Sequence, residues 1–154
     1  MPADRRNRQI FKNAQGGFTL IEVLVSVLVL SIGLLGMAAL QINAMKNNQS
    51  SFQRTQAIML SYFMLDSMRT NRTDALNGNY NMAKTCAVPA VGGSLVSNDR
   101  HFWVQALKDN IANDNGTCGE IACAGTTCTV RIYWDDGRGT GGSSTQMFQT
   151  STRL

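Results

Sequence analysis

Apolar residues are concentrated in one segment close to the start of the chain. Residues 18–40 are almost entirely apolar, and residues 23–40 contain no charged side chain. As an α-helix, these 23 residues extend for roughly 35 Å at about 1.5 Å per residue, which is enough to span a hydrocarbon core of roughly 30 Å. An ordinary secretory signal has a shorter apolar core of about 7–15 residues. The pattern therefore predicts a transmembrane helix over residues 18–40.

The helical pattern continues beyond the apolar segment. Neither proline nor glycine occurs between residues 37 and 70, and large apolar residues recur at intervals of three, seven, seven and four. This spacing is typical of an amphipathic helix. We therefore predict one helix over residues 18–70, with its second half packed on a globular domain through this apolar stripe. The stripe consists of Ile42, Met45, Phe52, Met59 and Phe63, and is widened by Ile58, Tyr62, Leu65 and Met68.

The next segment predicts turns followed by a short helix. Residues 71–74 and 77–79 are rich in Asn, Asp, Thr and Gly, which favour loops and turns. Asn98 and Asp99 suit the cap of a helix over residues 100–111. The buried side of this helix is predicted to contain Phe102, Trp103, Ala106, Leu107 and Ile111.

The last part of the chain predicts strands. Residues 127–134 alternate in polarity and are rich in β-branched residues, and residues 122–124 are a second candidate strand. A turn over residues 135–137 and a loop over 139–144 lead to a final strand over 145–154, with Met147 and Phe148 as packing residues. The predicted fold class is α+β, in which a two- or three-stranded antiparallel sheet of the 71–154 domain lies against the long helix.

Charge is distributed unevenly along the chain. The 14 basic and 10 acidic residues give a formal net charge of +4, and the first 17 residues carry Arg5, Arg6, Arg8 and Lys12 against Asp4. Basic residues before a membrane span place that end in the cytoplasm, so we expect residues 71–154 on the far side of the membrane. The remainder is nearly neutral and offers no electrostatic basis for binding nucleic acid.

All four cysteines lie in the exported part of the chain. An even number of cysteines in a small exported domain predicts two disulfides, for which three pairings exist. Cys123 and Cys128 flank a plausible hairpin tip, which favours that pair together with Cys86 and Cys118. A zinc site that uses three cysteines and His101 is the alternative, but the cysteine spacing does not fit the usual zinc motifs. We expect neither a metal nor another cofactor.

No motif predicts an enzyme. His101 is the single histidine, and cysteines in disulfides provide no thiolate nucleophile. Asp135 and Asp136 lack the remainder of a calcium-binding loop and predict a polar turn. The glycines of residues 139–142 are not followed by the lysine of a phosphate-binding loop. We therefore expect no catalytic residues.

Glu22 interrupts the apolar segment. A carboxylate within a membrane span costs about 2.5–3.5 kcal/mol at the helix centre and less near the end. Glu22 either reaches water at the interface or has a dedicated partner, and its surroundings bear on this choice. The sequence Gly16-Gly17-Phe18-Thr19-Leu20-Ile21-Glu22 resembles the class III signal of type IV prepilins and of the pseudopilins of type II secretion.

The resemblance implies a processing and assembly site. A prepilin peptidase would remove residues 1–17 by cleaving between Gly17 and Phe18, and the new amine of Phe18 would be methylated. In this family the glutamate at the position of Glu22 is proposed to pair with the terminal amine of a neighbouring subunit, and Thr19 belongs to the same assembly region. Other pilins would be the partners, and the helix would lie in a bacterial inner membrane with residues 71–154 in the periplasm.

A narrower resemblance is to the PilV group of minor pilins. It rests on Gly33 and Gly36 without a proline in the apolar helix, on the helix with Trp103 and Leu107, and on the strand that ends at Trp134. It implies a minor subunit that helps to start pilus assembly with other minor pilins and the major pilin, and that serves adhesion and twitching motility. The alternatives are a minor pseudopilin of type II secretion and a membrane-anchored domain that binds a ligand or DNA.

Overall fold

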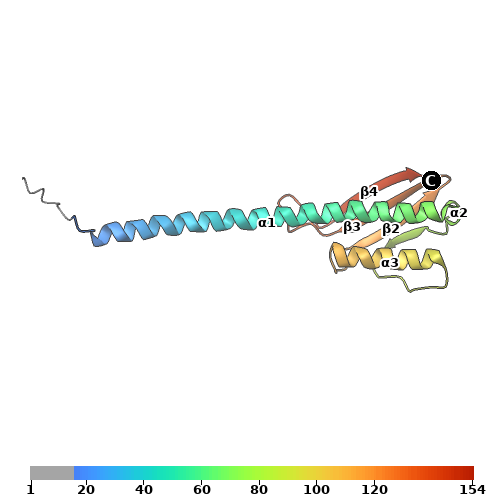
Figure 1. Cartoon of the computed structure of the whole chain (residues 1–154), viewed down its shortest axis with the longest axis horizontal. Helices are drawn as coiled ribbons and strands as arrows, with labels where there is room; N and C mark the ends of the chain where they lie inside the picture. Colours follow the sequence, from blue (N-terminus) through green and yellow to red (C-terminus); the bar gives the residue numbers. More distant parts are fainter. Residues whose placement is uncertain (1–15) are drawn as a thin grey trace, which may run out of the picture. The chain divides into compact units, whose positions relative to one another are not determined.

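The chain has an α+β architecture, in which a long apolar helix is followed by a small sheet domain (Figure 1). The computed structural model describes residues 16–154, so the predicted basic leader lies outside the described residues except for Gly16 and Gly17. The elements are α1 (Leu20–Thr70), α2 (Arg72–Leu76), β1 (Met82–Thr85), α3 (Leu95–Asn110), β2 (Cys118–Ala124), β3 (Thr127–Trp134) and β4 (Gln146–Arg153).

The chain divides into two compact units, Met1–Ala39 and Leu40–Leu154, and α1 contributes to both. In the first unit, α1 is exposed along its whole length, and its apolar stretch is long enough to cross a membrane. The helix begins at Leu20, two residues later than predicted, because the Thr19 carbonyl accepts the first helical hydrogen bonds. Threonine is a favoured residue at the position before a helix, which explains the later start.

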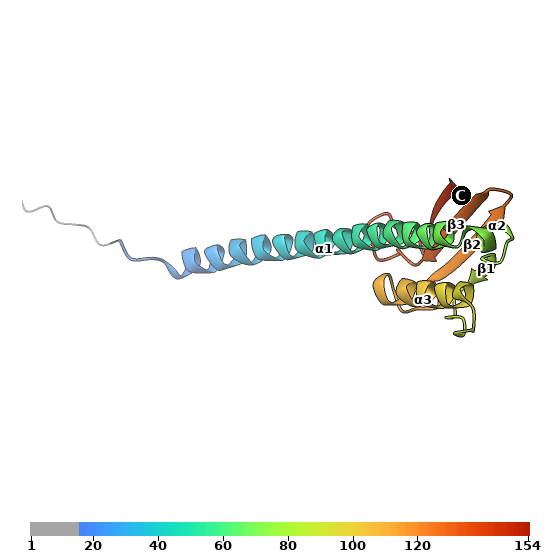
Figure 2. The same cartoon turned by 45° about the vertical axis from the view of Figure 1, so that its right-hand side comes forward.

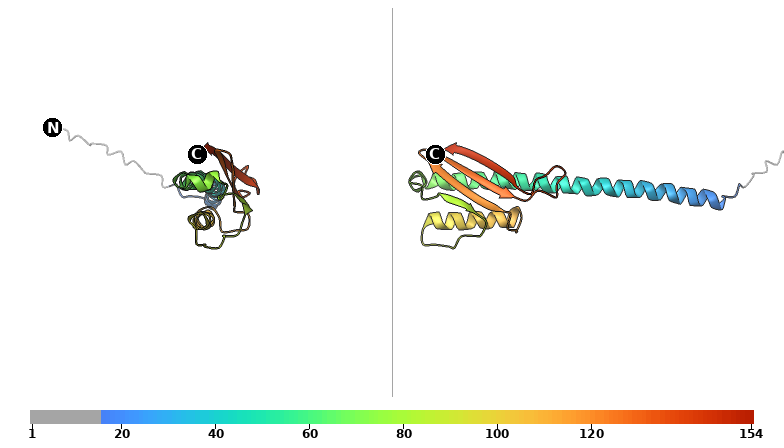
Figure 3. Two further views of the ribbon diagram at one scale, coloured as in Figure 1. Left: turned by 90° about the vertical axis from the view of Figure 1, so that its right-hand side faces the viewer. Right: turned by 180° about the vertical axis from the view of Figure 1, so that it is seen from behind.

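In the second unit, four antiparallel strands form one sheet in the order β1-β2-β3-β4. Figures 1 to 3 show α1 and α3 on the same face of this sheet. The prediction of two or three strands was wrong, because β1 has four residues and is too short to show an alternating pattern. Gly125 and Thr126 form the two-residue turn between β2 and β3, and Gly125 has a φ of 58°, as the first position of a type II′ turn requires.

α1 packs on the sheet through a different face from the one predicted. Ile42, Met45, Phe52, Met59 and Phe63 are between 53% and 73% exposed. The face of α1 that packs on the domain includes the fully buried Ala57 and Ser61. These five residues of the predicted stripe, and Tyr62 with them, point away from the domain, whereas Leu65 and Met68 of the same stripe are buried as predicted. The buried residues of α1 are Gln53, Ala57, Ser61, Met64, Leu65 and Met68.

α3 begins earlier than predicted and turns a different face inward. Its cap is Ser94, whose side chain accepts a hydrogen bond from the Ser97 amide, so the helix starts five residues before residue 100. Trp103 and Leu107 are fully buried as predicted, but Phe102 is 60% exposed. The reason is local, because Phe102 and Trp103 are adjacent and lie about 100° apart around a helix.

The two residues predicted as the cap of α3 lie within the helix and bind other segments. Asp99 accepts a hydrogen bond of 2.5 Å from the hydroxyl of Tyr80, and Asn98 accepts one from the amide of Gly92. The pKa of Tyr80 is raised to about 12, mainly because the side chain is buried and next because its hydroxyl is hydrogen-bonded to Asp99. Residues 72–76 form the short helix α2 rather than part of the predicted loop, and α2 leads the chain into this contact.

Gly119 allows α3 to lie against β2. The indole of Trp103 packs over Gly119, and a Cβ atom there would lie 2.5 Å from the ring. The Trp103 indole also donates a hydrogen bond of 2.9 Å to the Leu60 carbonyl of α1. Trp103 therefore connects the sheet, α3 and α1.

Gly119→Ala should lower the free energy of unfolding by about 1–3 kcal/mol, because the added methyl group forces a buried indole out of its packing. Gly93→Ala is the matched control, since a Cβ atom at Gly93 meets nothing within 4 Å. The measurement is urea unfolding of the full chain in detergent, monitored by tryptophan fluorescence. Equal unfolding midpoints for the two variants would contradict the packing described for Trp103.

Candidate processing and assembly site

The predicted cleavage bond lies in a segment that precedes the first helix. Residues 16–19 have no regular secondary structure and are exposed. A Cβ atom built at Gly16 or at Gly17 would meet no other atom within 4 Å, and Phe18 is 82% exposed. An exposed, non-helical segment is the kind of backbone that proteases reach, and glycine lets an enzyme approach the chain closely. The geometry is compatible with cleavage between Gly17 and Phe18, which stays a prediction.

Glu22 lies in the first turn of α1. Its amide donates to the Thr19 carbonyl at 3.1 Å, and its carbonyl accepts a hydrogen bond of 2.7 Å from the Ser26 hydroxyl. Its carboxylate, in contrast, has no hydrogen bond or ion pair with any side chain or backbone group of residues 16–154. A carboxylate near a helix N-terminus is stabilised by the helix dipole by about 0.3–1 kcal/mol. That is less than the cost of a carboxylate at the centre of a membrane span.

Cleavage before Phe18 would create a positively charged amine close to Glu22 in the sequence. A new α-amino group has a pKa of about 7.7–8.0 in model peptides, and a methylated amine still carries a positive charge. At the start of α1 that charge meets the unfavourable end of the helix dipole. After such a cleavage, the amine would need a negatively charged partner, and the Glu22 carboxylate has no positively charged partner among residues 16–154.

The comparison with known families agrees with this site. Residues 12–38 match the model of the prokaryotic N-terminal methylation motif. The matched stretch includes Gly17, Phe18, Thr19 and Glu22 and indicates a pilin or a pseudopilin. The motif belongs to structural subunits rather than to enzymes, and it implies processing by a prepilin peptidase and assembly with other pilins. No curated protein and no solved structure matches the chain.

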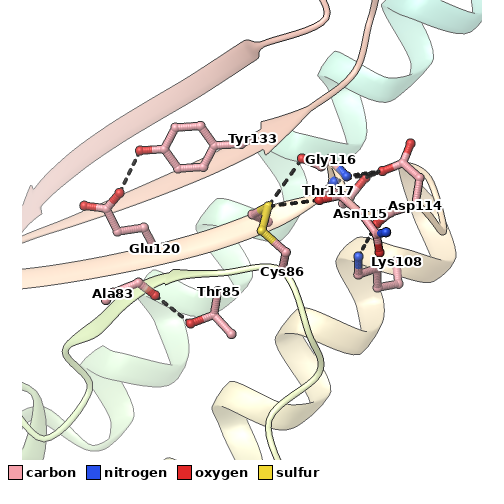
Figure 4. Close-up of a disulfide and its surroundings, with 11 residues drawn as sticks. Ala83, Thr85, Cys86, Lys108, Asp114, Asn115, Gly116, Thr117, Glu120 and Tyr133 are labelled. Atoms are coloured by element: carbon pink, nitrogen blue, oxygen red, sulfur yellow. Dashed lines mark hydrogen bonds between the residues drawn. A yellow bond between two sulfur atoms is a disulfide. The ribbon is translucent and has the colours of Figure 1, made fainter.

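All four cysteines are paired. One disulfide joins Cys86, just after β1, to Cys118 at the start of β2 (Figure 4). The other joins Cys123 to Cys128, which face each other across the β2–β3 hairpin. This is the pairing that the hairpin argument favours, and paired cysteines provide no thiolate for zinc. His101 lies with its Nδ1 atom 2.7 Å from the Pro89 carbonyl.

The acidic pair that follows β3 has a structural role that the sequence did not reveal. Asp136 is buried and accepts hydrogen bonds from the Ser50 hydroxyl at 2.7 Å and from the Arg54 guanidinium at 3.1 Å. Asp135 accepts from the Gly137 amide, as expected for a turn. Asp136 thereby fastens the β3–β4 loop to α1, at the rim of a polar cavity of about 310 Å³. The sequence could not reveal this buried side chain, because its partners Ser50 and Arg54 lie far from it along the chain.

The two disulfides should differ in their contribution to stability. The Cys86–Cys118 bond spans 32 residues and the Cys123–Cys128 bond spans five. Since loop-closure entropy grows with loop length, the longer loop should contribute about 4 kcal/mol and the shorter about 2 kcal/mol. Replacing both members of each pair by serine and measuring urea unfolding of the full chain in detergent tests this order. A larger loss for the Cys123/Cys128 variant would contradict it.

Proposed function

We propose that this protein is a minor pilin of a type IV pilus, similar to the PilV group, and that it helps to start pilus assembly with other minor pilins and the major pilin. The observation that carries the proposal is the methylation motif at residues 12–38, whose Gly17, Phe18 and Glu22 stand at the start of an exposed apolar helix. Before assembly, the subunit lies in the inner membrane with its sheet domain in the periplasm. It then enters the filament, where it serves adhesion and twitching motility.

The second unit supports a role in assembly through the exposed face of α1. At about 100° per residue, Met45, Phe52 and Met59 lie far around the helix from Ala57 and Met64, which face the sheet. α1 therefore has one apolar face that its own domain covers and another that it leaves open. A contiguous exposed apolar surface marks a site of interaction with protein or membrane. A filament subunit has such neighbours.

In the proposed filament, Glu22 pairs with the methylated amine of Phe18 of the next subunit. Each ion compensates the other in apolar surroundings, where either alone is costly. A buried ion pair adds little net stability but penalises every register that leaves the charges apart. Glu22 therefore positions subunits and contributes little to the folding of the sheet domain.

Processing predicts a defined mass. We expect the protein isolated from membranes of its source bacterium to lack residues 1–17 and to carry one additional methyl group on Phe18. Intact-mass spectrometry measures both changes at once. The matched control is the same strain without its prepilin peptidase, which should yield the unprocessed chain. A full-length, unmethylated chain in the wild-type strain would reject the proposed function.

Glu22→Ala should reduce incorporation into sheared filaments by roughly tenfold or more, because the loss of a charge pair removes the preference for one register. The free energy of unfolding of the sheet domain should stay within about 0.5 kcal/mol of wild type. Ser26→Ala is the control, since the Ser26 hydroxyl bonds only the backbone of its own helix. Quantitative immunoblots of filaments and membranes give the ratio, and normal incorporation of the alanine variant at position 22 would contradict the pairing.

A minor pseudopilin of type II secretion carries the same signal, so the phenotype of a deletion separates the two. Loss of pili and of twitching supports the pilin assignment. Normal pili together with loss of protein secretion would assign the chain to the secretion system.

A further inference from the structure

The sheet has two edges of different character. β1 has four residues, carries Lys84, and shows a shift in register between Met82 and Thr85. Short length, a charged residue and an irregular register are features that keep an edge strand from pairing with other chains. β4 has eight residues in unbroken register with β3, from Gln146 to Arg153. Figure 3 shows β4 as the outermost strand on its side of the sheet.

The hydrogen bonds of β4 identify the backbone groups that point outward. The amide of Leu154 donates to the Thr126 carbonyl on the turn before β3. Since bonded and non-bonded pairs alternate along antiparallel strands, the even-numbered residues of β4 bond to β3. The N–H and C=O groups of Met147, Gln149, Ser151 and Arg153 face the open side. For the first three of these residues, no hydrogen-bond partner for those groups exists within residues 16–154.

The charge along this edge is confined to one end. Residues 146–152 contain neither a charged residue nor a proline. At the far end, the exposed Arg153 is joined by Arg72, which donates to the Leu154 carbonyl at 3.0 Å, and by Arg69, which donates to the Thr152 hydroxyl. Arg69 is paired with Asp66, but neither Arg72 nor Arg153 forms an ion pair with another residue of the described chain.

Arg131, on the neighbouring strand β3, already has an acidic partner. Arg131 of β3 contacts the Glu120 carboxylate, and the Tyr133 hydroxyl donates to the same carboxylate at 2.6 Å. The hydrogen bond from Tyr133, together with Arg131, lowers the pKa of Glu120, so this carboxylate stays charged. The exposed Arg153 therefore supplies the positive charge at the open edge, whereas the Arg72 guanidinium is bound to the main-chain oxygen of Leu154.

We propose that the edge of β4 binds an extended strand of a different subunit of the same filament, uncharged where it pairs with Met147 to Ser151 and carrying a carboxylate opposite Arg153. Backbone hydrogen bonds supply the affinity in this kind of strand addition, and the charge pair sets the register. The proposal rests on the proposed function, since it takes its partner from the pilus.

A second copy of this chain fits the edge less well than a different subunit. Two-fold pairing of β4 with β4 reverses the direction of α1 between the copies, whereas subunits anchored in one membrane with one topology run in the same direction. Pairing of β4 with β1 of a second copy meets the short, irregular edge that bears Lys84. The open edge therefore fits a strand of a different subunit better than a strand of a second copy of this chain.

Met147→Pro is the direct test. Proline at this position removes an N–H group that faces outward and places its ring in the path of an added strand, while the backbone hydrogen bonds between β3 and β4 remain. The full chain is expressed in its source bacterium, and the ratio of protein in sheared filaments to protein in membranes is measured. We expect a drop of roughly tenfold, which corresponds to the loss of about one or two hydrogen bonds. Ala90→Pro, at an exposed loop position, is the matched control and should match wild type.

Arg153→Glu leaves the backbone unchanged and keeps the test valid if the proline variant fails to fold, as judged by its thermal midpoint and its disulfides. We expect reduced incorporation of this variant as well. Wild-type incorporation of either folded variant overturns the proposal. A benzophenone amino acid at Ser151 that cross-links to another pilin supports it, and cross-linking to a second copy overturns it. If the wild-type chain is processed but absent from filaments, the proposed function fails instead, and this outcome is visible without any variant.

Discussion

The packing of one face of α1 on the sheet domain is the contact on which the rest of the second unit depends. Ala57, Ser61, Met64, Leu65 and Met68 have no exposed surface, so this face of the helix lies wholly within the domain. The large apolar residues on the other side of the helix take no part in this contact, and they can stay exposed without weakening the attachment of α1 to the domain.

This division of faces links the fold to assembly. Phe52 and Met59 are not needed for the hydrophobic core, and their exposure has a cost in water unless a partner covers them. The same reasoning applies to Glu22, whose carboxylate finds no compensating group within the described chain. The protein therefore carries two kinds of unsatisfied surface, one apolar and one charged. In the proposed filament, neighbouring subunits would cover both.

Disulfides connect the strands of the domain to one another, and polar contacts attach the domain to α1. The two disulfides fasten the start and the end of β2, which lies between β1 and β3. Asp136 attaches the β3–β4 loop to α1 through Ser50 and Arg54, so the loop that leads into β4 has a defined anchor. A small sheet of this size gains from such links because its core is limited.

Much of this protein is determined by its sequence alone, because the relevant signals are local. A run of apolar residues predicts the membrane helix, and Gly17, Phe18 and Glu22 lie close enough together to be recognised as one motif. The strand over residues 127–134 alternates clearly enough to be predicted with its observed bounds. The face of α1 that packs, the strand β1, the start of α3 and the burial of Asp136 were decided only by the tertiary structure. Each depends on contacts between segments far apart in the chain, and periodicity alone does not distinguish an apolar face that meets its own sheet from one that is left for another molecule.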